Sequence, residues 1–153
     1  MKTLEQEIKN SKPIPPGQRA MLNILFTASL VERTMSHNMR KYKLTNPQYN
    51  ILRILKGSHP KGLSVLDIKE RMLDKSSNVS RLVEKLKVAG LVERTVSEAD
   101  KRMVIVSITQ SGLDMVEAME EVRLESETSM GKCLTKDEII LLGNLLDRYR
   151  ASS

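Results

Sequence analysis

The hydrophobic pattern of this chain changes period near residue 90, and that change constrains the fold more than any other feature. Before it, residues 65–90 repeat apolar side chains at every third or fourth position, which is the spacing of amphipathic helices. After it, residues 91–96 and 104–108 are rich in β-branched side chains, which favour strands. The polar, charged residues 97–102 between these two segments predict a hairpin connection. We therefore expect helices followed by a two-stranded ribbon.

Two short helices precede the predicted hairpin, and capping residues mark their ends. Ser64 starts the first helix, and Asp67 lies three residues later, where its carboxylate can complete a capping box. Residues 74–77 form a polar turn rich in capping residues, and Gly90 ends the second helix. The apolar positions that predict the buried faces are Val65, Ile68 and Met72, followed by Val79, Leu82, Val83 and Leu86.

Further helices are predicted on both sides of this segment. Thr45 supplies a cap residue and Pro47 suits the first helical turn, so a helix is expected to begin there. Residues 11–17 hold three of the five prolines and predict a loop or an extended arm. The fold class is therefore mainly α with a small β-hairpin. Apolar spacing predicts the flanking helices at residues 18–42, 45–57, 113–130 and 135–149.

Composition excludes several classes of protein. The chain has 153 residues, 40% of them hydrophobic, which suffices for one compact domain or one protomer of an intimate oligomer. No apolar run approaches the roughly 18 residues of a membrane helix and the N-terminus is polar, so we expect a cytoplasmic protein with no membrane partner. Aromatic residues, at 3%, are too few for a platform that stacks single-stranded nucleic acid. With one Cys and two His, neither a metal site, a cofactor nor an enzymatic activity is expected.

The net charge of +6 is distributed unevenly along the chain. Counting Lys and Arg against Asp and Glu gives +8 for residues 1–62, +2 for residues 63–112 and −4 for residues 113–153. A basic excess of this kind suits a polyanionic partner, but it also suits a merely solvated surface. The charge alone does not separate these two interpretations, so the motifs must decide.

Two short helices joined by a tight turn and followed by a charged hairpin are the pattern of a winged helix-turn-helix. In that arrangement the second helix enters a DNA groove and the hairpin reaches alongside it. Asn can bind adenine edges and Arg can bind guanine, while serine hydroxyls suit phosphate oxygens. An ordinary polar helix surface is the alternative interpretation. The candidate contacts near the start or on the outward side of the second helix are Ser76, Ser77, Asn78, Ser80, Arg81 and Lys85.

Residues 44–112 resemble the MarR family of bacterial transcriptional regulators. The matching motifs follow one another in the order typical of that family: GLVER at residues 90–94, DKR at residues 100–102 and TQSG at residues 109–112. The resemblance extends to the helices predicted on both flanks. It implies a winged helix-turn-helix protein that binds double-stranded DNA.

The resemblance also assigns roles to charged residues of the hairpin. Arg102 would enter the minor groove, where negative potential is concentrated, and Asp100 would orient the basic side chains nearby. Lys101 and Lys85 would contact phosphates, which add affinity but little sequence information. Arg94 is expected to be the ion-pair partner of Asp100 and so to support the wing.

Members of that family are obligate dimers whose N-terminal and last two helices interlock. The chain is therefore expected to form a homodimer on a palindromic operator, and the family favours a repressor over an activator. By this division residues 1–17 are an N-terminal arm and residues 18–43 a dimerisation helix. Residues 44–112 are the DNA-binding domain, and residues 113–153 form the C-terminal dimerisation helices.

Many members of the family release DNA when a small, often aromatic or phenolic, acid binds beside the dimerisation helices, so the resemblance implies such an effector. Cys133 is expected to be an incidental thiol, because the chain has no second Cys to resolve it. The competing function is a winged-helix protein-interaction module without specific DNA recognition. The side chains that can line an adaptable effector pocket, or simply form core and dimer contacts, are Met21, Leu25, Met35, Met39, Tyr42, Met72 and Met115.

Overall fold

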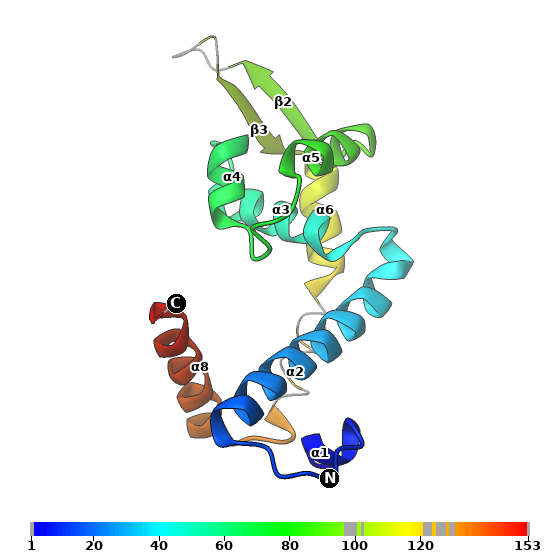
Figure 1. Cartoon of the computed structure of the whole chain (residues 1–153). Coiled ribbons are helices and arrows are strands. Elements are labelled where there is room, and N and C mark those ends of the chain that lie inside the picture. Colours follow the sequence, from blue (N-terminus) through cyan, green and yellow to red (C-terminus); the bar gives the residue numbers. More distant parts are fainter. Residues whose placement is uncertain are drawn as a thin grey trace.

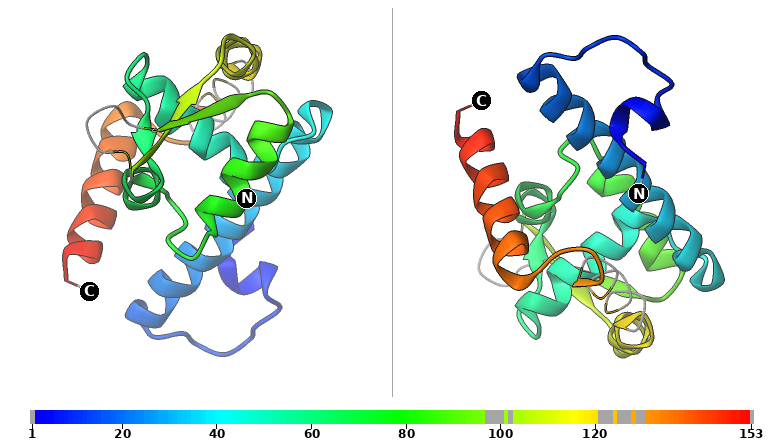
Figure 2. Two further views of the ribbon diagram at one scale, coloured as in Figure 1. Left: turned by 90° about the horizontal axis from the view of Figure 1, so that it is seen from above. Right: turned by 90° about the horizontal axis from the view of Figure 1, so that it is seen from below.

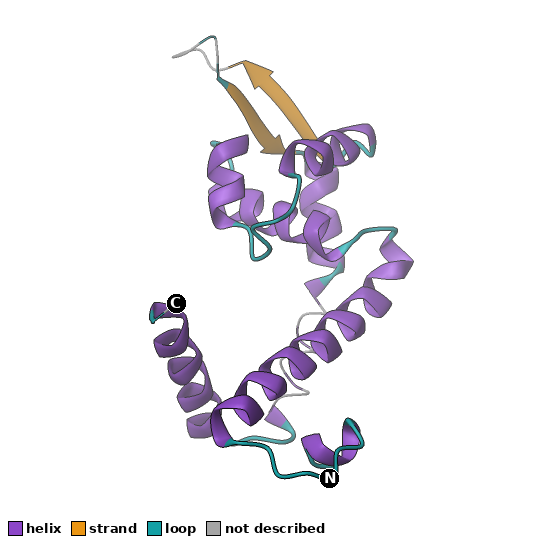
Figure 3. Cartoon of the chain, in the orientation of Figure 1, coloured by secondary structure: helices purple, strands orange, loops and turns teal. Residues whose placement is uncertain are grey.

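The computed structural model of the chain describes residues 2–96, 101, 103–120, 124, 128 and 131–152. Helices and a small sheet form one lobe, and a long helix leads from it to a second group of helices (Figure 1, Figure 3). We call the first part, α3 to α6, the winged lobe. We call the second part, made of α1, α2 and α8, the helical body. The predicted fold class, mainly helical with a small β-hairpin, is confirmed.

The helical body contains α1 (Leu4–Glu7), α2 (Pro16–Met39) and α8 (Lys136–Ala151), and the short helix η1 (Arg40–Tyr42) follows α2. Seen from several sides, α1 and α8 lie on either side of the N-terminal half of α2 (Figure 1, Figure 2). Among the described residues no helix is both long and apolar enough to cross a membrane. The elements of the winged lobe are α3 (Asn46–Ser58), β1 (Leu63–Ser64), α4 (Val65–Arg71), α5 (Val79–Val88), β2 (Val92–Val96), β3 (Val104–Ile108) and α6 (Gln110–Ala118).

The hydrophobic core lies in the winged lobe. Helix α3 contacts α4, α5, α6 and β3, and its side chains Ile51, Leu52 and Leu55 are completely buried. In the described part of α2 only Met39 is buried, and no described residue of α8 is. The winged lobe is therefore packed like an independent domain, whereas the body leaves apolar surface uncovered. The remaining core residues are Leu44, Tyr49, Ile68, Met72, Val79, Val83, Leu86, Leu91, Val92, Val106, Ile108, Val116 and Met119.

Helix starts in the winged lobe follow the capping predicted from the sequence. Thr45 and Gln48 form a capping box at the start of α3, and Ser64 and Asp67 form another at the start of α4. Each box satisfies two backbone amides that have no partner within the helix. Hydrogen bonds from the Ser64 hydroxyl and backbone amide also lower the pKa of Asp67.

The end of α5 is a Schellman motif centred on Gly90. The Gly90 amide donates to the Lys87 carbonyl at 2.9 Å, and the Leu91 amide donates to the Leu86 carbonyl at 3.0 Å. Gly90 has a φ of 72°, a conformation that an L side chain would strain. Leu86 and Leu91 are both buried, so the chain turns from helix to strand around an apolar contact. The predicted helix end at Gly90 is confirmed.

The sheet has one more strand than the sequence predicted. Within the described residues its order is β1-β3-β2, with both pairs antiparallel. Leu63 pairs with Val106, and Val92 pairs with Ile108. Strand β1 is only two residues long, and its pairing with a segment more than forty residues away leaves no local signal in the sequence.

Thr109 ties the base of the hairpin to the end of α5. Its amide donates to the Leu91 carbonyl at 3.1 Å, and its hydroxyl donates to the Gly90 carbonyl at 2.8 Å. The same hydroxyl accepts the Gly112 amide at 3.1 Å and so caps α6. The GLVER and TQSG motifs are thus in direct contact and fix the hairpin relative to α5.

Two side chains, Tyr42 and Asn46, make three hydrogen bonds that join the body to the winged lobe. The Tyr42 hydroxyl donates to the Ala118 carbonyl at 2.6 Å, linking η1 to the end of α6. The Asn46 side-chain amide, at the start of α3, donates to the Glu32 carbonyl at 3.2 Å and to the Ser36 hydroxyl at 3.0 Å, both on α2. These bonds set the angle between α2 and the winged lobe.

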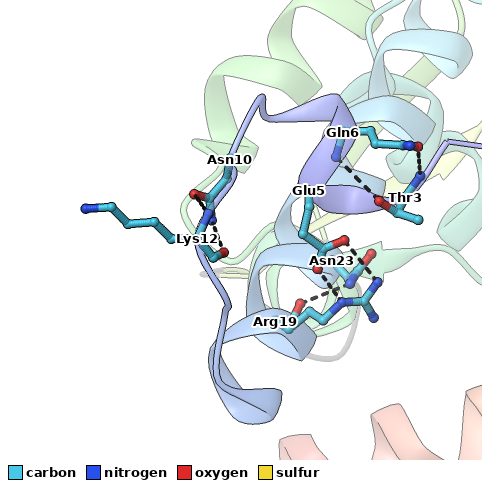
Figure 4. A network of polar contacts seen from close by, with 7 residues as sticks. All are labelled: Thr3, Glu5, Gln6, Asn10, Lys12, Arg19 and Asn23. Carbon is cyan, nitrogen blue, oxygen red and sulfur yellow. Dashed lines mark hydrogen bonds and ion pairs between the residues drawn. The ribbon is translucent and has the colours of Figure 1, made fainter.

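Residues 11–15 form the loop that their prolines predicted, and the residues before them form helix α1, which the sequence did not predict and which packs against α2 (Figure 4). Thr3 and Gln6 form a capping box at the start of α1, and Leu4 is buried. Glu5 and Arg19 form an ion pair at 2.6 Å, and this hydrogen bond lowers the pKa of Glu5 to about 2. Helix α2 begins at Pro16, two residues earlier than predicted, because proline suits the first helical turn.

Candidate nucleic-acid interface

The turn between α4 and α5 is organised around the carboxylate of Asp74. Oδ1 of Asp74 accepts the Ser76 amide at 2.9 Å and the Ser76 hydroxyl at 2.6 Å, while Oδ2 accepts the Ser77 hydroxyl at 2.9 Å. These hydrogen bonds hold the pKa of Asp74 below its usual range, and the bond from the Ser76 hydroxyl has the largest effect. The carboxylate is therefore ionised at neutral pH. Sequence reasoning placed the two serines here but missed Asp74, although an Asp two residues before a serine is a common turn pattern.

This turn is also fixed to the core of the winged lobe. The Leu73 amide donates to Oδ1 of Asn50, on α3, at 3.0 Å. The preceding Met72 is almost completely buried. The turn is thus held at both ends, by the core before it and by α5 after it, and its polar groups have defined positions.

Helix α5 has one buried and one exposed face, as the sequence predicted. Val79, Val83 and Leu86 pack into the core. Among the predicted contacts, Ser80, Arg81 and Lys85 are exposed on α5, Ser76 and Asn78 are exposed just before it, and Ser77 is half-buried. Helix α5 contacts β2, so this helix and the hairpin lie side by side at one end of the molecule (Figure 1).

Asn78 has a structural role that the sequence analysis did not predict. Its Oδ1 accepts the Arg81 amide at 3.1 Å and so caps the start of α5. A bidentate contact with adenine needs both the oxygen and the nitrogen of an Asn side chain. The side-chain nitrogen and the second lone pair of Oδ1 remain for such a contact, so Asn78 would share its oxygen between the cap and the base.

The described part of the hairpin contains an ion pair that the sequence did not predict. Arg94, on β2, lies 3.2 Å from the carboxylate of Glu84 on α5. Its predicted partner Asp100 and the predicted groove residue Arg102 are outside the described residues, while Lys101 is exposed. Both members of the observed pair are largely exposed, so the pair contributes little stability, about 0.2 to 1 kcal/mol. It nevertheless joins β2 to α5.

An open hollow of about 620 Å³ lies along the C-terminal half of α2. The side chains suggested from the sequence for an effector pocket do not line it. Met39 and Met72 are buried in the core, whereas Met21 and Leu25 are exposed on α2. Helical spacing alone did not distinguish core from pocket. The hollow is lined instead by Ser29, Leu30, Glu32, Arg33, Thr34, Ser36, His37 and Arg40.

In the part of the chain that the structure describes, no group of three or more His, Cys, Asp or Glu side chains is placed to hold a metal ion. Cys133 is exposed in the turn before α8, in the helical body rather than the winged lobe.

Comparisons with known proteins agree with this geometry. A family model described as MarR family matches residues 42–103. The transcriptional repressor IacR of Pseudomonas putida is 30% identical over 115 residues, which cover 75% of this chain and 68% of IacR. This chain belongs to the MarR family. The resemblance found in the sequence is thereby confirmed, and the relatives are regulators of transcription rather than enzymes.

Solved structures extend the match to most of the MarR fold. The crystal structure of the S. aureus MepR–DNA complex matches with a TM-score of 0.78 at 23% identity and covers 85% of this chain and 95% of MepR. BpsR of Bordetella bronchiseptica, whose DNA binding is regulated by 6-hydroxynicotinic acid, matches with a TM-score of 0.78 at 21% identity. The match covers 91% of this chain and 98% of BpsR. The likeness therefore includes the helical body as well as the winged lobe.

Proposed function

We propose that this MarR-family protein binds double-stranded DNA sequence-specifically and represses transcription. The observation that carries the proposal is α5, which buries Val79, Val83 and Leu86, exposes Ser80, Arg81 and Lys85, and packs against strand β2 of the hairpin. A helix of this kind fits the major groove, and the adjacent hairpin reaches the neighbouring groove. MepR, which has the same fold, has been solved in complex with DNA.

In this proposal the hairpin tip supplies the second contact. Arg102 enters the minor groove, with Asp100 as its positioning neighbour and Lys101 on a phosphate. Residues 1–112 carry the whole basic excess of the chain, whereas residues 113–153 carry a net charge of −4. Residues 63–112, which include α5 and the hairpin, hold +2 of that excess, so the charge favours a polyanionic partner without singling out the winged lobe.

We propose further that the protein works as a homodimer through its helical body. The chain exposes 11370 Å², whereas a compact monomer of 17.3 kDa exposes about 7,800 Å². The excess of about 3,500 Å² is larger than the roughly 1,000 to 2,500 Å² that each partner buries in an obligate dimer. Large apolar side chains exposed on α2 are Met21, Ile24, Leu25, Phe26, Leu30 and Val31, and those on α8 are Ile140, Leu141, Leu142, Leu145 and Tyr149.

A two-fold dimer presents two copies of α5, so its operator is a palindrome with half-sites about one DNA turn apart. Repression follows from the position of such a complex on DNA, since a dimer bound over a promoter excludes polymerase. The relative IacR is named a repressor. The domain division predicted from the sequence, with residues 44–112 as the DNA-binding domain, is part of this proposal.

The effector in this proposal is a small aromatic acid that binds in the hollow along α2. Arg33, His37 and Arg40 offer nitrogen donors to a carboxylate. The relative BpsR responds to an aromatic acid of this kind. We expect an effector of this class to release DNA, and Arg40→Ala to weaken that release while leaving the DNA affinity unchanged.

Selection of binding sites from a random library of DNA duplexes tests the DNA-binding proposal. The wild-type protein is expected to enrich a palindrome and to bind it with two chains per duplex. Arg102→Ala should lower the affinity for that palindrome roughly tenfold or more while the protein stays folded and dimeric. Lys136→Ala, which removes an exposed charge from the start of α8, is the matched control and should bind as the wild type does.

One observation favours a second candidate, a protein-interaction module. Leu66 on α4 is 66% exposed, Leu73 in the turn is 87% exposed and Val88 on α5 is 83% exposed. Exposed apolar side chains on a winged lobe can form a binding surface for a protein partner. If no duplex is enriched and binding is weak, salt-sensitive and indifferent to sequence, this second function replaces the first.

A further inference from the structure

The hydroxyl groups of Ser76 and Ser77 both donate their hydrogen bonds to the Asp74 carboxylate. An ionised carboxylate can only accept hydrogen bonds, so in each contact with Asp74 the serine hydroxyl must be the donor. The distances of 2.6 Å for Ser76 and 2.9 Å for Ser77 are those of normal O–H···O bonds. Each hydroxyl has a single proton, and therefore only oxygen lone pairs remain to face outward.

Phosphate oxygens are acceptors as well, so they cannot bond to these hydroxyls in their present state. A hydroxyl that turned its proton to a phosphate would have to give up its bond to the ionised Asp74 carboxylate, so it would exchange one charge-assisted hydrogen bond for another without a gain. The negative charge of Asp74 also repels a phosphate at the same place. Both effects act against the phosphate role that the sequence suggested for the two serines.

We propose that Asp74 is a positioning residue that presents the Ser76 and Ser77 oxygens as acceptors for amino groups on base edges in the major groove. The groups that fit are the N4 amino group of cytosine and the N6 amino group of adenine, which donate hydrogen bonds into that groove. The inference rests on the proposed entry of α5 into DNA. It adds a specificity-determining role for a carboxylate that does not itself touch DNA.

The surroundings of the turn hold this arrangement in place. The Ser76 amide also donates to Oδ1 of Asp74, and the Ser77 amide donates to the Asp74 carbonyl at 3.3 Å. Asn50 fixes the start of the turn through the Leu73 amide. Ser76 is exposed, so its oxygen is the more accessible of the two, while Ser77 is half-buried.

Ser80 provides a contrast on the helix that follows this turn. It is exposed in the first turn of α5, and among the described contacts its hydroxyl makes no hydrogen bond. Its proton is therefore available to a phosphate oxygen. Ser76 and Ser80 are the same residue type on the same surface, but they are expected to contact different parts of DNA.

A double-mutant cycle between protein and DNA tests the proposal on the selected palindrome. Each adenine in the site is replaced by purine, which lacks the N6 amino group, and each cytosine by 2-pyrimidinone, which lacks N4. At one position the loss of the amino group is expected to weaken wild-type binding about 3- to 10-fold. Ser76→Ala should show the same loss on the unmodified site and no further loss at that modified position.

Two variants serve as controls in the same assay. Asp74→Asn keeps the size of the side chain and the acceptor for the Ser76 amide but removes the charge, so one serine proton is released. It is expected to bind scrambled DNA more tightly and to lower the ratio of specific to nonspecific affinity. Ser80→Ala should weaken binding equally on both duplexes and be coupled to removal of a phosphate charge by a methylphosphonate rather than to any amino group.

The outcomes separate this inference from the proposed function. If Ser76→Ala is coupled to a methylphosphonate, or leaves both affinities unchanged, the role of Asp74 is refuted while sequence-specific binding stands. If the wild-type protein selects no palindrome, the proposed function fails at the first step and the inference fails with it.

Discussion

Replacement of Gly112 by Ala tests the packing that holds the hairpin on the winged lobe. A Cβ atom at position 112 would lie 2.2 Å from the Leu91 carbonyl oxygen and 2.6 Å from Cγ1 of Ile108. A carbon and an oxygen normally approach to about 3.3 Å, so the backbone would have to move by about 1 Å. The nearest atom is a backbone carbonyl oxygen, which cannot rotate out of the way as the end of a flexible side chain could.

The cost has two sources. Overpacking in a well-packed region costs about 1 to 3 kcal/mol. The Leu91 carbonyl also accepts the Thr109 amide, and distortion of that hydrogen bond costs about 1 kcal/mol more. We therefore expect Gly112→Ala to lower the free energy of unfolding by about 2 to 4 kcal/mol. For a chain of this size the midpoint of thermal unfolding should fall by about 5 to 15 °C.

Chemical and thermal denaturation at one fixed protein concentration measure this loss, because the stability of a dimer depends on concentration. Gly57→Ala is the matched control, since Gly57 lies exposed in α3 and a Cβ there meets nothing within 4 Å. That control should be as stable as the wild type or more stable by up to about 1 kcal/mol. A Gly112→Ala protein within about 0.5 kcal/mol of the wild type would refute the close approach described above.

Three further predictions concern the body and its connections. Tyr42→Phe removes the hydroxyl that joins η1 to α6, so the free energy of unfolding should fall by about 1 kcal/mol in denaturant titrations, and no change would exclude a role for that bond. The pKa of Glu5 is lowered by Arg19 to about 2, so the ion pair stabilises the docked arm above pH 4.5 and is lost as the pH falls towards 2. NMR shifts of the arm should follow this titration in the wild type but not in Glu5→Gln. Leu25→Asp should yield monomers in light scattering, whereas the equally exposed Leu66→Asp should leave the dimer intact, and a dimeric Leu25→Asp protein would contradict the proposed interface.

Features set by neighbours in the sequence could be predicted, and features set by distant partners could not. The capping boxes at Thr45 and Ser64 and the turn at Gly90 depend on residues within a few positions, and the structure contains all three. Strand β1 depends on pairing with β3, and the arm depends on an ion pair between Glu5 and Arg19, fourteen residues apart. No pattern of neighbouring residues in the sequence predicts either contact.

The same division applies to the candidate interface. Its location and its exposed side chains on α5 followed from helical spacing. The hydrogen bonds that those side chains already make could not be predicted in this way. Asn78 caps α5, and Asp74 accepts a hydrogen bond from each serine hydroxyl. Arg94 pairs with Glu84, a residue that faces β2 only after α5 and the hairpin have packed together. Residue type and position thus predict where the protein can touch DNA, whereas hydrogen-bond geometry determines which chemical groups it offers.

The central claim is sequence-specific DNA binding by a dimer, and a competition titration tests it most directly. The DNA that flanks the coding sequence of this protein is compared with a scrambled duplex of equal length over a series of salt concentrations. We predict an affinity at least a thousandfold higher, at physiological salt, for the native duplex, with two chains bound to each. Equal affinity for both duplexes, lost together as salt rises, would contradict the claim.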